Sequence, residues 1–277
     1  MPNNYIAYHF SIVPKEPWED ILLAQLQDLP FESFESSKSA LHAFIPEHLH
    51  FKDFLKEIPL FDNSKVTIEY EIETIEAINW NAKWEAEYHP ILIGENCVVR
   101  ANFHPSMTKQ YELIINPKMS FGTGHHQTTQ MMLEFVLAES IEDKIILDMG
   151  CGTGVLGILA CKRGASKVFA IDNDPWCVEN TKENMKLNTC QNISVHLNSS
   201  IDSYNYKYDL IFANINRNIL LEQIPSYSKA MNPEAILLLS GFYNKDIQVL
   251  KTLCINEGLS FIGEKKNQDW CALKFKK

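Results

Sequence analysis

The sequence lacks the segments that would carry a chain into or across a membrane. None of its apolar runs approaches the roughly 20 residues of a membrane span, and residues 1–4 do not lead a charged segment into an apolar one, so no secretory signal is expected. Paired cysteines are missing as well: the seven cysteines are scattered, odd in number and never spaced C-x-x-C, which disfavours a disulfide framework and a zinc site. We therefore expect a cytoplasmic protein with reduced thiols, no membrane contact and no bound metal.

Positive charge is scarce in the first part of the chain. Residues 1–76 carry 5 Lys and Arg against 14 Asp and Glu, a balance of −9, whereas residues 77–277 carry 20 against 21. Nearly all of the net charge of −10 therefore belongs to the first quarter of the chain. An acidic lobe repels phosphate backbones and attracts basic proteins, so we expect a basic protein partner and no direct contact with nucleic acid. A merely solvated acidic surface is the alternative interpretation.

Hydrophobic residues make up 45% of the 277, which is enough for a buried core and two domains. In residues 1–76 the patterns predict strand, helix, strand, strand, helix and strand, at residues 5–13, 17–29, 31–36, 40–45, 46–58 and 66–75. This order predicts a smaller ferredoxin-like α+β N-terminal domain for substrate recognition. RNA-recognition modules share the order, but their basic-glycine-aromatic signature is missing here. Residues 77–95 are then a predicted linker, and residues 96–277 a second domain.

The most informative motif is a glycine-rich turn between an apolar strand and a helix. The strand at residues 145–147 ends on Asp148, and a helical pattern begins at residue 155. Between them stand three alternating glycines: Gly150, Gly152 and Gly154. Glycine lets a backbone turn tightly and approach a ligand where a Cβ atom would clash. The next strand ends on Asp172, whose carboxylate can accept hydrogen bonds from both ribose hydroxyls of a nucleoside, so we predict a nucleoside-containing cofactor at this edge of a parallel sheet.

Two cofactor classes are compatible with this turn. Residues 152–157 match G-x-G-x-x-G with an acid 20 residues after the first glycine, which is also the dinucleotide fingerprint of dehydrogenases. S-adenosyl-L-methionine is favoured because the turn begins early, at Gly150, and because Asp148 can bond the amino group of a methionine moiety, directly or through water, but would repel a pyrophosphate. The last two predicted strands, residues 260–264 and 270–275, form the terminal hairpin that a methyltransferase sheet needs. A tight turn without a ligand is the remaining alternative.

A second glycine-containing loop precedes this motif. Residues 117–129, P-K-M-S-F-G-T-G-H-H-Q-T-T, carry two histidines and three threonines directly before a helical pattern. With this loop the chain resembles, nearly end to end, the bacterial methyltransferase family that modifies large-subunit ribosomal protein eleven. The features that carry the resemblance are Phe31-Glu32-Ser33-Phe34-Glu35, the paired Trp80 and Trp84, the loop Phe121-Gly122-Thr123-Gly124-His125-His126, the motif from Asp148 to Gly154, Asp172 with Asp174-Pro175, and Asn214-Ile215. One residue departs from the family pattern, since Gln127 stands where the family usually has proline.

The resemblance implies a Rossmann-like class I methyltransferase sheet, S-adenosyl-L-methionine as cofactor, and methyl transfer to lysine side-chain or N-terminal amino groups of that ribosomal protein. It implies that the cofactor contacts Thr129, Gly150, Asp172 and Asn214. It also implies a loop that covers the cofactor and lines the substrate entrance, made of Phe121, Gly122, Thr123, Gly124, His125 and His126. The two histidines have no carboxylate or cysteine partner at metal-ligand spacing, so a role in structuring the loop or in packing against the cofactor is favoured over a metal site.

Asn214 is the candidate catalytic residue. It follows a predicted apolar strand at residues 208–213, and its side-chain oxygen can accept a hydrogen bond from a target amine or from adenine. A turn-forming asparagine is the alternative. A glutamine methyltransferase of release factors would need N-P-P-[YF] here, whereas residues 214–217 are N-I-N-R. An S-adenosylmethionine-dependent RNA methyltransferase is a further alternative, which the acidity of residues 1–76 disfavours.

Overall fold

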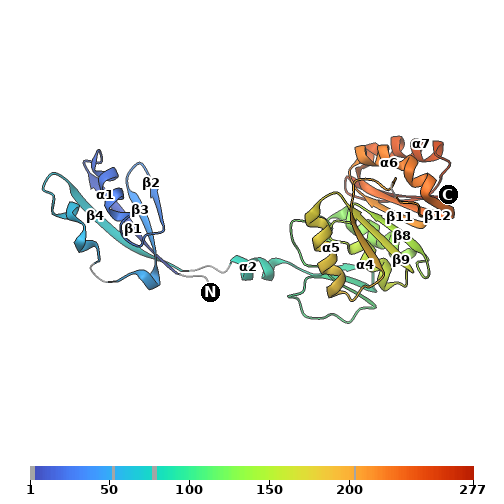
Figure 1. Cartoon of the computed structure of the whole chain (residues 1–277), viewed down its shortest axis with the longest axis horizontal. Helices are drawn as coiled ribbons and strands as arrows, with labels where there is room; N and C mark the ends of the chain where they lie inside the picture. The colour runs from blue at the N-terminus through green and yellow to red at the C-terminus, as the bar shows by residue number, and fades with distance from the viewer. Residues whose placement is uncertain (1–3, 52–53, 77–79, 203) are drawn as a thin grey trace. The chain divides into compact units, whose positions relative to one another are not determined.

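The computed structural model divides the chain into two compact units, Met1–Glu87 and Tyr88–Lys277 (Figure 1). It describes residues 4–51, 54–76, 80–202 and 204–277. The segment predicted as a linker, residues 77–95, is shared between the units: α2 (Trp80–Glu87) belongs to the first, β5 (Ile91–Ile93) belongs to the second, and residues 77–79 lie outside the described residues. Across the described ranges, no helix is long and apolar enough to cross a membrane.

The first unit contains a four-stranded antiparallel sheet in the order β2-β3-β1-β4. Its main elements are β1 (Tyr5–Val13), α1 (Trp18–Leu26), β2 (Ser33–Ser36), β3 (Leu41–Pro46) and β4 (Thr67–Ile75). Alternate residues of β1 are buried in the core of this unit, to which α1 contributes Leu22 and Leu26. The strand order is that of ferredoxin-like folds, which confirms the predicted fold class of the N-terminal domain.

The helix predicted at residues 46–58 was wrong. The described part of this segment forms short 3₁₀ turns instead: η1 (Glu47–Leu49), η2 (Phe54–Glu57) and η3 (Pro59–Asp62). The first turn ends at His50, whose backbone is extended and whose Nε2 lies 2.7 Å from the Tyr8 hydroxyl oxygen. The turns bury Leu55, Ile58 and Leu60, and Ile58 is extended because the residue before a proline, here Pro59, disfavours helical backbone angles.

An acidic stripe runs along β4, which forms one edge of this sheet. Glu69, Glu71 and Glu73 are exposed and point to the same face, because side chains alternate along a strand. Glu73 Oε2 lies 3.2 Å from Nε2 of His9 on the neighbouring β1. The alternation seen in the sequence therefore places three carboxylates side by side at the sheet edge.

The second unit is built on a seven-stranded sheet in the order β10-β9-β8-β11-β12-β14-β13. Its strands are β8 (Ile145–Met149), β9 (Lys167–Asp172), β10 (Ile193–Leu197), β11 (Tyr208–Asn214), β12 (Met231–Tyr243), β13 (Ser260–Asn267) and β14 (Trp270–Lys276). The first five are parallel, whereas β14 lies antiparallel between β12 and β13. A parallel sheet that ends in an antiparallel hairpin confirms the predicted class I methyltransferase fold.

Helices cover both faces of this sheet (Figure 1). They are α3 (Gln127–Ala138), α4 (Val155–Lys162), α5 (Pro175–Leu187), α6 (Arg217–Ala230) and α7 (Ile247–Asn256). Buried side chains of α3 and α4 form one core with the sheet, and those of α6 and α7 form another. The sequence analysis did not predict α6, which contains Pro225 in its interior, where proline is disfavoured. Its start is marked by Asn216, whose side chain accepts a hydrogen bond from the Ile219 N–H.

A separate three-stranded sheet leads the chain to the functional site. It consists of β5, β6 (Cys97–Arg100) and β7 (Tyr111–Ile114). Two asparagines of the α5 region fasten it: Asn188 Oδ1 accepts from the Ile114 N–H and Asn184 Oδ1 accepts from the Asn116 N–H, both at 2.9 Å. These bonds fix the chain immediately before residues 117–126, which run beside the glycine turn and into α3.

Candidate functional site

The glycine turn, residues 150–154, connects β8 to α4 at the carboxyl end of the parallel strands. The N–H groups of Gly150 and Cys151 donate to the Ile171 carbonyl oxygen at 2.8 and 3.1 Å, so the turn lies against the end of β9. Gly150 has a φ of 70° and Gly152 a φ of 55°, which glycine adopts readily. A Cβ atom at Gly150 would overlap the Ile215 side chain, and one at Gly152 would overlap the Phe121 carbonyl oxygen. Both positions therefore require glycine for conformation and for space.

Asp172 lies where the sequence predicted it, at the end of β9 beside the glycine turn. Its Oδ2 accepts from the Gly152 N–H at 2.9 Å, and its Oδ1 accepts from the Asp174 N–H at 3.0 Å. A carboxylate has about four acceptor positions, so these two bonds orient the group and leave acceptor capacity for a ligand. The side chain is nearly buried yet lines both cavities described below.

Asp148 lies near the end of β8, as the sequence predicted, and its carboxyl is buried. It is 1% exposed, its Oδ2 accepts from the Gly157 N–H at 2.9 Å, and it is not among the residues that line the cavities. Burial raises the pKa of this carboxyl to about 7, an effect that the Gly157 N–H opposes and the negative charge of Asp172 reinforces. The contact of Asp148 with a cofactor amino group stays a prediction, and its observed role is to bond the first turn of α4.

The cover loop, residues 117–126, rests on the glycine turn. The Thr153 N–H donates to the Phe121 carbonyl oxygen at 2.9 Å, and the Thr153 hydroxyl donates to the Gly122 carbonyl oxygen at 2.6 Å. Gly124, with a φ of 97°, lets the loop turn against the Val99 side chain before α3 begins. The sequence motif thus becomes a loop fastened to the cofactor motif by two hydrogen bonds.

The two histidines of the cover loop have structural partners. His126 caps α3, because its Nδ1 accepts from the Thr128 N–H at 3.3 Å. Burial lowers the pKa of His126, and chiefly burial also lowers that of His125, whose ring packs 4.4 Å from the Tyr88 ring. Within the described residues, no group of three metal-ligating side chains occurs.

Two adjoining cavities open at the carboxyl ends of the parallel strands. The larger, of about 580 Å³, is lined by Met119, Phe121, His126, Thr128, Gly150, Gly152, Asp172, Asn173, Asp174, Cys177, Asn214, Ile215, Asn216, Ile219, Gly241 and Trp270. The smaller, of about 240 Å³, shares Gly150, Asp172, Asn173, Ile215 and Ile219 with it. Small-molecule sites commonly measure about 300–1,000 Å³, so the two cavities together suit a nucleoside joined to a further group.

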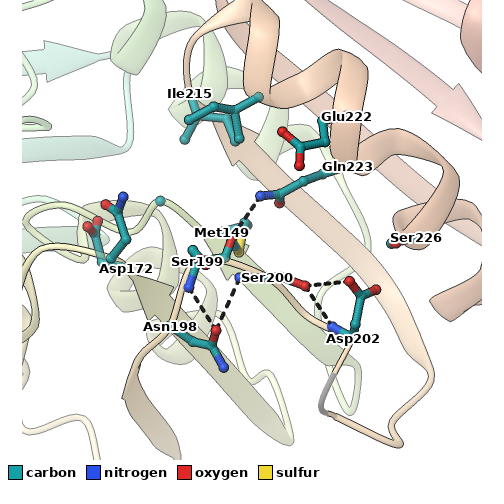
Figure 2. Close-up of a pocket in the computed structure, with 13 residues that line it drawn as sticks. Met149, Asp172, Asn198, Ser199, Ser200, Asp202, Ile215, Glu222, Gln223 and Ser226 are labelled. Carbon is teal, nitrogen blue, oxygen red and sulfur yellow. Dashed lines mark hydrogen bonds between the residues drawn. The ribbon is translucent and has the colours of Figure 1, made fainter.

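The smaller cavity is shaped by residues that follow β10 (Figure 2). Asn198 Oδ1 accepts from the N–H groups of Ser199 and Ser200 at 2.8 and 3.3 Å. Gln223 of α6 donates from Nε2 to the Ser199 carbonyl oxygen at 2.7 Å, so the loop is held from the other side. The sequence analysis missed these residues. Their one signal was position, because Asn198 directly follows a parallel strand and such strand ends share one sheet edge.

Asn214 and Thr129 carry polar atoms without a partner among the described residues. Asn214 ends β11 and lines the larger cavity, and its Oδ1 is buried with no hydrogen bond. Thr129 is buried in α3 and its Oγ1 likewise lacks a partner, although its neighbour Thr128, not Thr129, lines the cavity. Buried polar atoms are nearly always hydrogen-bonded in native proteins. The unpaired oxygens, the oriented Asp172 carboxylate and the glycine turn together fit S-adenosyl-L-methionine.

Comparisons with known proteins agree on one family. Residues 18–277 match the family model described as ribosomal protein L11 methyltransferase (PrmA). Relatives named ribosomal protein L11 methyltransferase include one from Phocaeicola vulgatus, 40% identical over 98% of both chains, and one from Porphyromonas gingivalis, 42% identical over 98% of this chain and 97% of its own. A crystal structure of a ribosomal protein L11 methylase from Lactobacillus delbrueckii subsp. bulgaricus is 26% identical, with a TM-score of 0.63 over 68% of this chain and 98% of that one.

Proposed function

The chain belongs to the ribosomal protein L11 methyltransferase family, and from that premise we propose that it methylates lysine side-chain or N-terminal amino groups of large-subunit ribosomal protein L11. Family and fold make it an S-adenosylmethionine-dependent protein methyltransferase. Asn214 supports the proposal most directly, because the residue lines the larger cavity and its buried Oδ1 has no partner among the described residues, which leaves it an acceptor for an amine N–H.

The residues of the site suit each part of the cofactor. Asp172 would accept hydrogen bonds from the ribose hydroxyls, and the smaller cavity beside Asn198 would hold adenine. The larger cavity would then hold the methionine part and the target amine. When bound, the cofactor supplies a methyl group on a positively charged sulfur, which is a good leaving group.

The target amine must arrive neutral and aligned. An unperturbed lysine amine has a pKa of roughly 10.4, and transfer into a poorly hydrated cavity lowers that pKa because burial disfavours the charged form. Asn214 Oδ1 would accept one N–H and hold the nitrogen lone pair in line with the methyl carbon. The new carbon–nitrogen bond would be balanced by the carbon–sulfur bond that the cofactor gives up, and the surplus proton would leave the nitrogen for solvent. His126 is unsuited to take this proton, because its Nδ1 already accepts a hydrogen bond at the start of α3.

The first unit would recognise the protein substrate. Residues 1–76 hold nearly all of the net negative charge, and the acidic stripe of Glu69, Glu71 and Glu73 is exposed at a sheet edge. A basic ribosomal protein is attracted to such a surface, whereas RNA is repelled, so RNA methylation is the less favoured alternative. We also propose a cytoplasmic location, which the seven free cysteines support.

Methyl transfer to purified ribosomal protein L11 tests this proposal. Incubation with S-adenosyl-L-methionine, followed by intact-mass and peptide mass spectrometry, should show added methyl groups on amines of the protein. Asp172→Ala is the matched control, since loss of the ribose contacts should abolish methylation at limiting cofactor while the protein stays folded. Unmodified ribosomal protein L11 together with methylated ribosomal RNA would overturn the proposal in favour of the RNA alternative.

A further inference from the structure

One side of the larger cavity is aromatic. Phe121 and His126 of the cover loop and Trp270 of β14 all line it. The Trp270 ring lies 4.8 Å from the His126 ring at an angle of 72°, and the Phe121 ring lies 5.1 Å from the His126 ring at 63°. Three rings from two distant segments of the chain are therefore joined edge to face around one cavity.

Trp270 is fixed in this position from behind. It begins β14, pairs with Tyr243 of β12, and its ring lies 4.3 Å from the Tyr243 ring at 31°. The hairpin turn before it is tied to the start of α3, directly after the cover loop, because Gln127 Nε2 donates to Gln268 Oε1 at 3.0 Å. Gln127 is the residue that departs from the family pattern, and here it links the two segments that carry the aromatic rings.

Charge is distributed unevenly around this cavity. Its two lining carboxylates, Asp172 and Asp174, come from the end of β9 and the turn after it. On the other side of the cavity, Gly241 lies on β12, the strand beside β14, and Asn214 lies on the next strand, β11; neither residue carries a charge. Among the described residues, those that line the cavity from β11, β12 and β14 are uncharged, so an amine at Asn214 would be bordered on that side by an amide and an aromatic ring and by no carboxylate.

We propose that Trp270 is a specificity-determining residue, which with Phe121 packs against the aliphatic stem of the target amine and holds its methylated ammonium by a cation–π interaction. This rests on the proposed amine methylation. The stem of a lysine is apolar, and a cationic head within about 6 Å of an aromatic ring is attracted to the ring face.

The proposal makes Trp270 more important with each methyl group added. Every transfer replaces an N–H of the amine by a methyl group, so Asn214 has fewer donors to bind, and a fully methylated nitrogen has none. The aromatic contact does not need an N–H and grows with apolar surface. Trp270 would thus retain partly methylated substrate for the next transfer and determine how many methyl groups one amine receives.

Two substitutions of similar bulk separate aromatic character from simple packing. Trp270→Phe keeps an aromatic face, and Trp270→Leu removes it. With purified ribosomal protein L11 as substrate, Trp270→Leu should raise KM roughly tenfold and leave mainly singly methylated amines at a turnover where the parent enzyme has completed methylation. Trp270→Phe should largely restore the parent pattern. Intact-mass spectrometry measures the product states, and calorimetric titration should show unchanged S-adenosyl-L-methionine affinity in both variants.

Trp176→Leu is the matched control, because this tryptophan is 69% exposed and does not line the cavity. Product states and KM unchanged in Trp270→Leu, with cofactor affinity intact, would overturn the role of Trp270 while leaving the proposed function standing. If Trp270→Leu lost cofactor binding through misfolding, Phe121→Leu on the exposed cover loop would replace it as the test. A shift to singly methylated product in Phe121→Leu would support the proposal, and an unchanged product pattern would overturn it. An inactive parent enzyme would instead contradict the proposed function.

Discussion

At the scale of single residues, the site depends on polar atoms whose surroundings set their chemistry. Asp172 and Asp148 lie at or near the carboxyl ends of β9 and β8 in the same sheet, but the first lines the cavities and the second is buried against the first turn of α4. Burial raises the pKa of Asp148 to about 7, whereas Asp172 is held by two N–H donors beside open space. Position relative to the cavity therefore separates two carboxylates that local sequence presents as equivalent.

Asn214→Ala should lower kcat by roughly tenfold to a hundredfold and change KM little. Its oxygen would align the amine, and a hydrogen bond of this kind contributes about 1.5–3 kcal/mol when charge develops on the donor. Steady-state kinetics on ribosomal protein L11 at saturating cofactor measure the effect. A raised KM with kcat intact would mean that Asn214 only binds substrate.

Asp148→Asn should remove a pH dependence from the stability of the ligand-free protein. The folded pKa of Asp148 is raised from 3.8 to about 7, so its contribution is fully present below about pH 3.8 and is lost as pH rises through 7. At about 1.4 kcal/mol per pKa unit the loss amounts to at most about 4 kcal/mol by pH 8. Asparagine keeps an acceptor for the Gly157 N–H and carries no charge.

Thermal unfolding at pH 5 and pH 8 tests this expectation. Asp148→Asn should exceed the parent protein in Tm at pH 8, and the difference should shrink at pH 5. An equal difference at both pH values would show that Asp148 does not titrate in this range.

At the scale of elements, the cover loop and the glycine turn form one unit. The sequence analysis assigned the glycines to cofactor approach, but at Gly152 the nearest obstacle to a side chain is the Phe121 carbonyl oxygen. Thr153 contributes two hydrogen bonds to the same loop. The conformation of the cover loop is therefore coupled to that of the cofactor motif.

Gly152→Val should displace the cover loop and weaken S-adenosyl-L-methionine binding by at least tenfold. The new side chain overlaps Phe121 and also strains a residue with a φ of 55°. Gly258→Val is the matched control, because Gly258 has a φ of 80° with nothing within 4 Å of its Cβ position. Calorimetry measures cofactor affinity, and limited proteolysis of residues 117–126 reports the loop. If the two substitutions had equal effects, backbone strain alone would explain the loss, and the overlap with Phe121 would play no part.

At the scale of the whole molecule, charge and chemistry are divided between the two units. The first unit has its own core and holds most of the net negative charge, while the proposed cofactor and amine sites lie in the second. We therefore expect changes of charge or salt to affect recognition of a basic substrate, and changes in the cavity to affect methyl transfer. Salt screens exposed charges over roughly 8 Å at physiological ionic strength and should slow association while leaving cofactor affinity nearly unchanged.

Replacing Glu69, Glu71 and Glu73 by glutamine should raise KM for ribosomal protein L11 and reduce the salt dependence of association, with cofactor affinity unchanged. The control is an equal charge change in the second unit, at Glu95, Glu142 and Glu179. Deletion of residues 1–87 should in turn abolish methylation of the protein and preserve cofactor binding. If the truncated enzyme methylated ribosomal protein L11 at the full rate, the first unit would not recognise the substrate, and its acidic residues would only form a solvated surface.

The sequence by itself determined the features that depend on neighbouring residues. Alternating glycines between a strand and a helix, an acid at the next strand end, and the Asp174-Pro175 helix start each follow local backbone rules, so their elements lie where we predicted them. The same holds for β4, whose alternation of glutamate and apolar residues is local. The ferredoxin-like and methyltransferase folds follow from the order of such elements.

Tertiary structure decided what depends on residues far apart in the chain. It buried Asp148, and it replaced a predicted helix by short turns around Leu55 and Ile58. It also joined the loop after Asn198 to Gln223 of α6 by a hydrogen bond. It also placed Trp270, the first residue of the last strand, against His126 of the cover loop. The periodicity of a sequence shows which face of a helix or strand is apolar. Which other element packs against that face is decided only when the whole sheet and its helices assemble. For this reason the cofactor motif was predictable, and the aromatic side of the amine site was not.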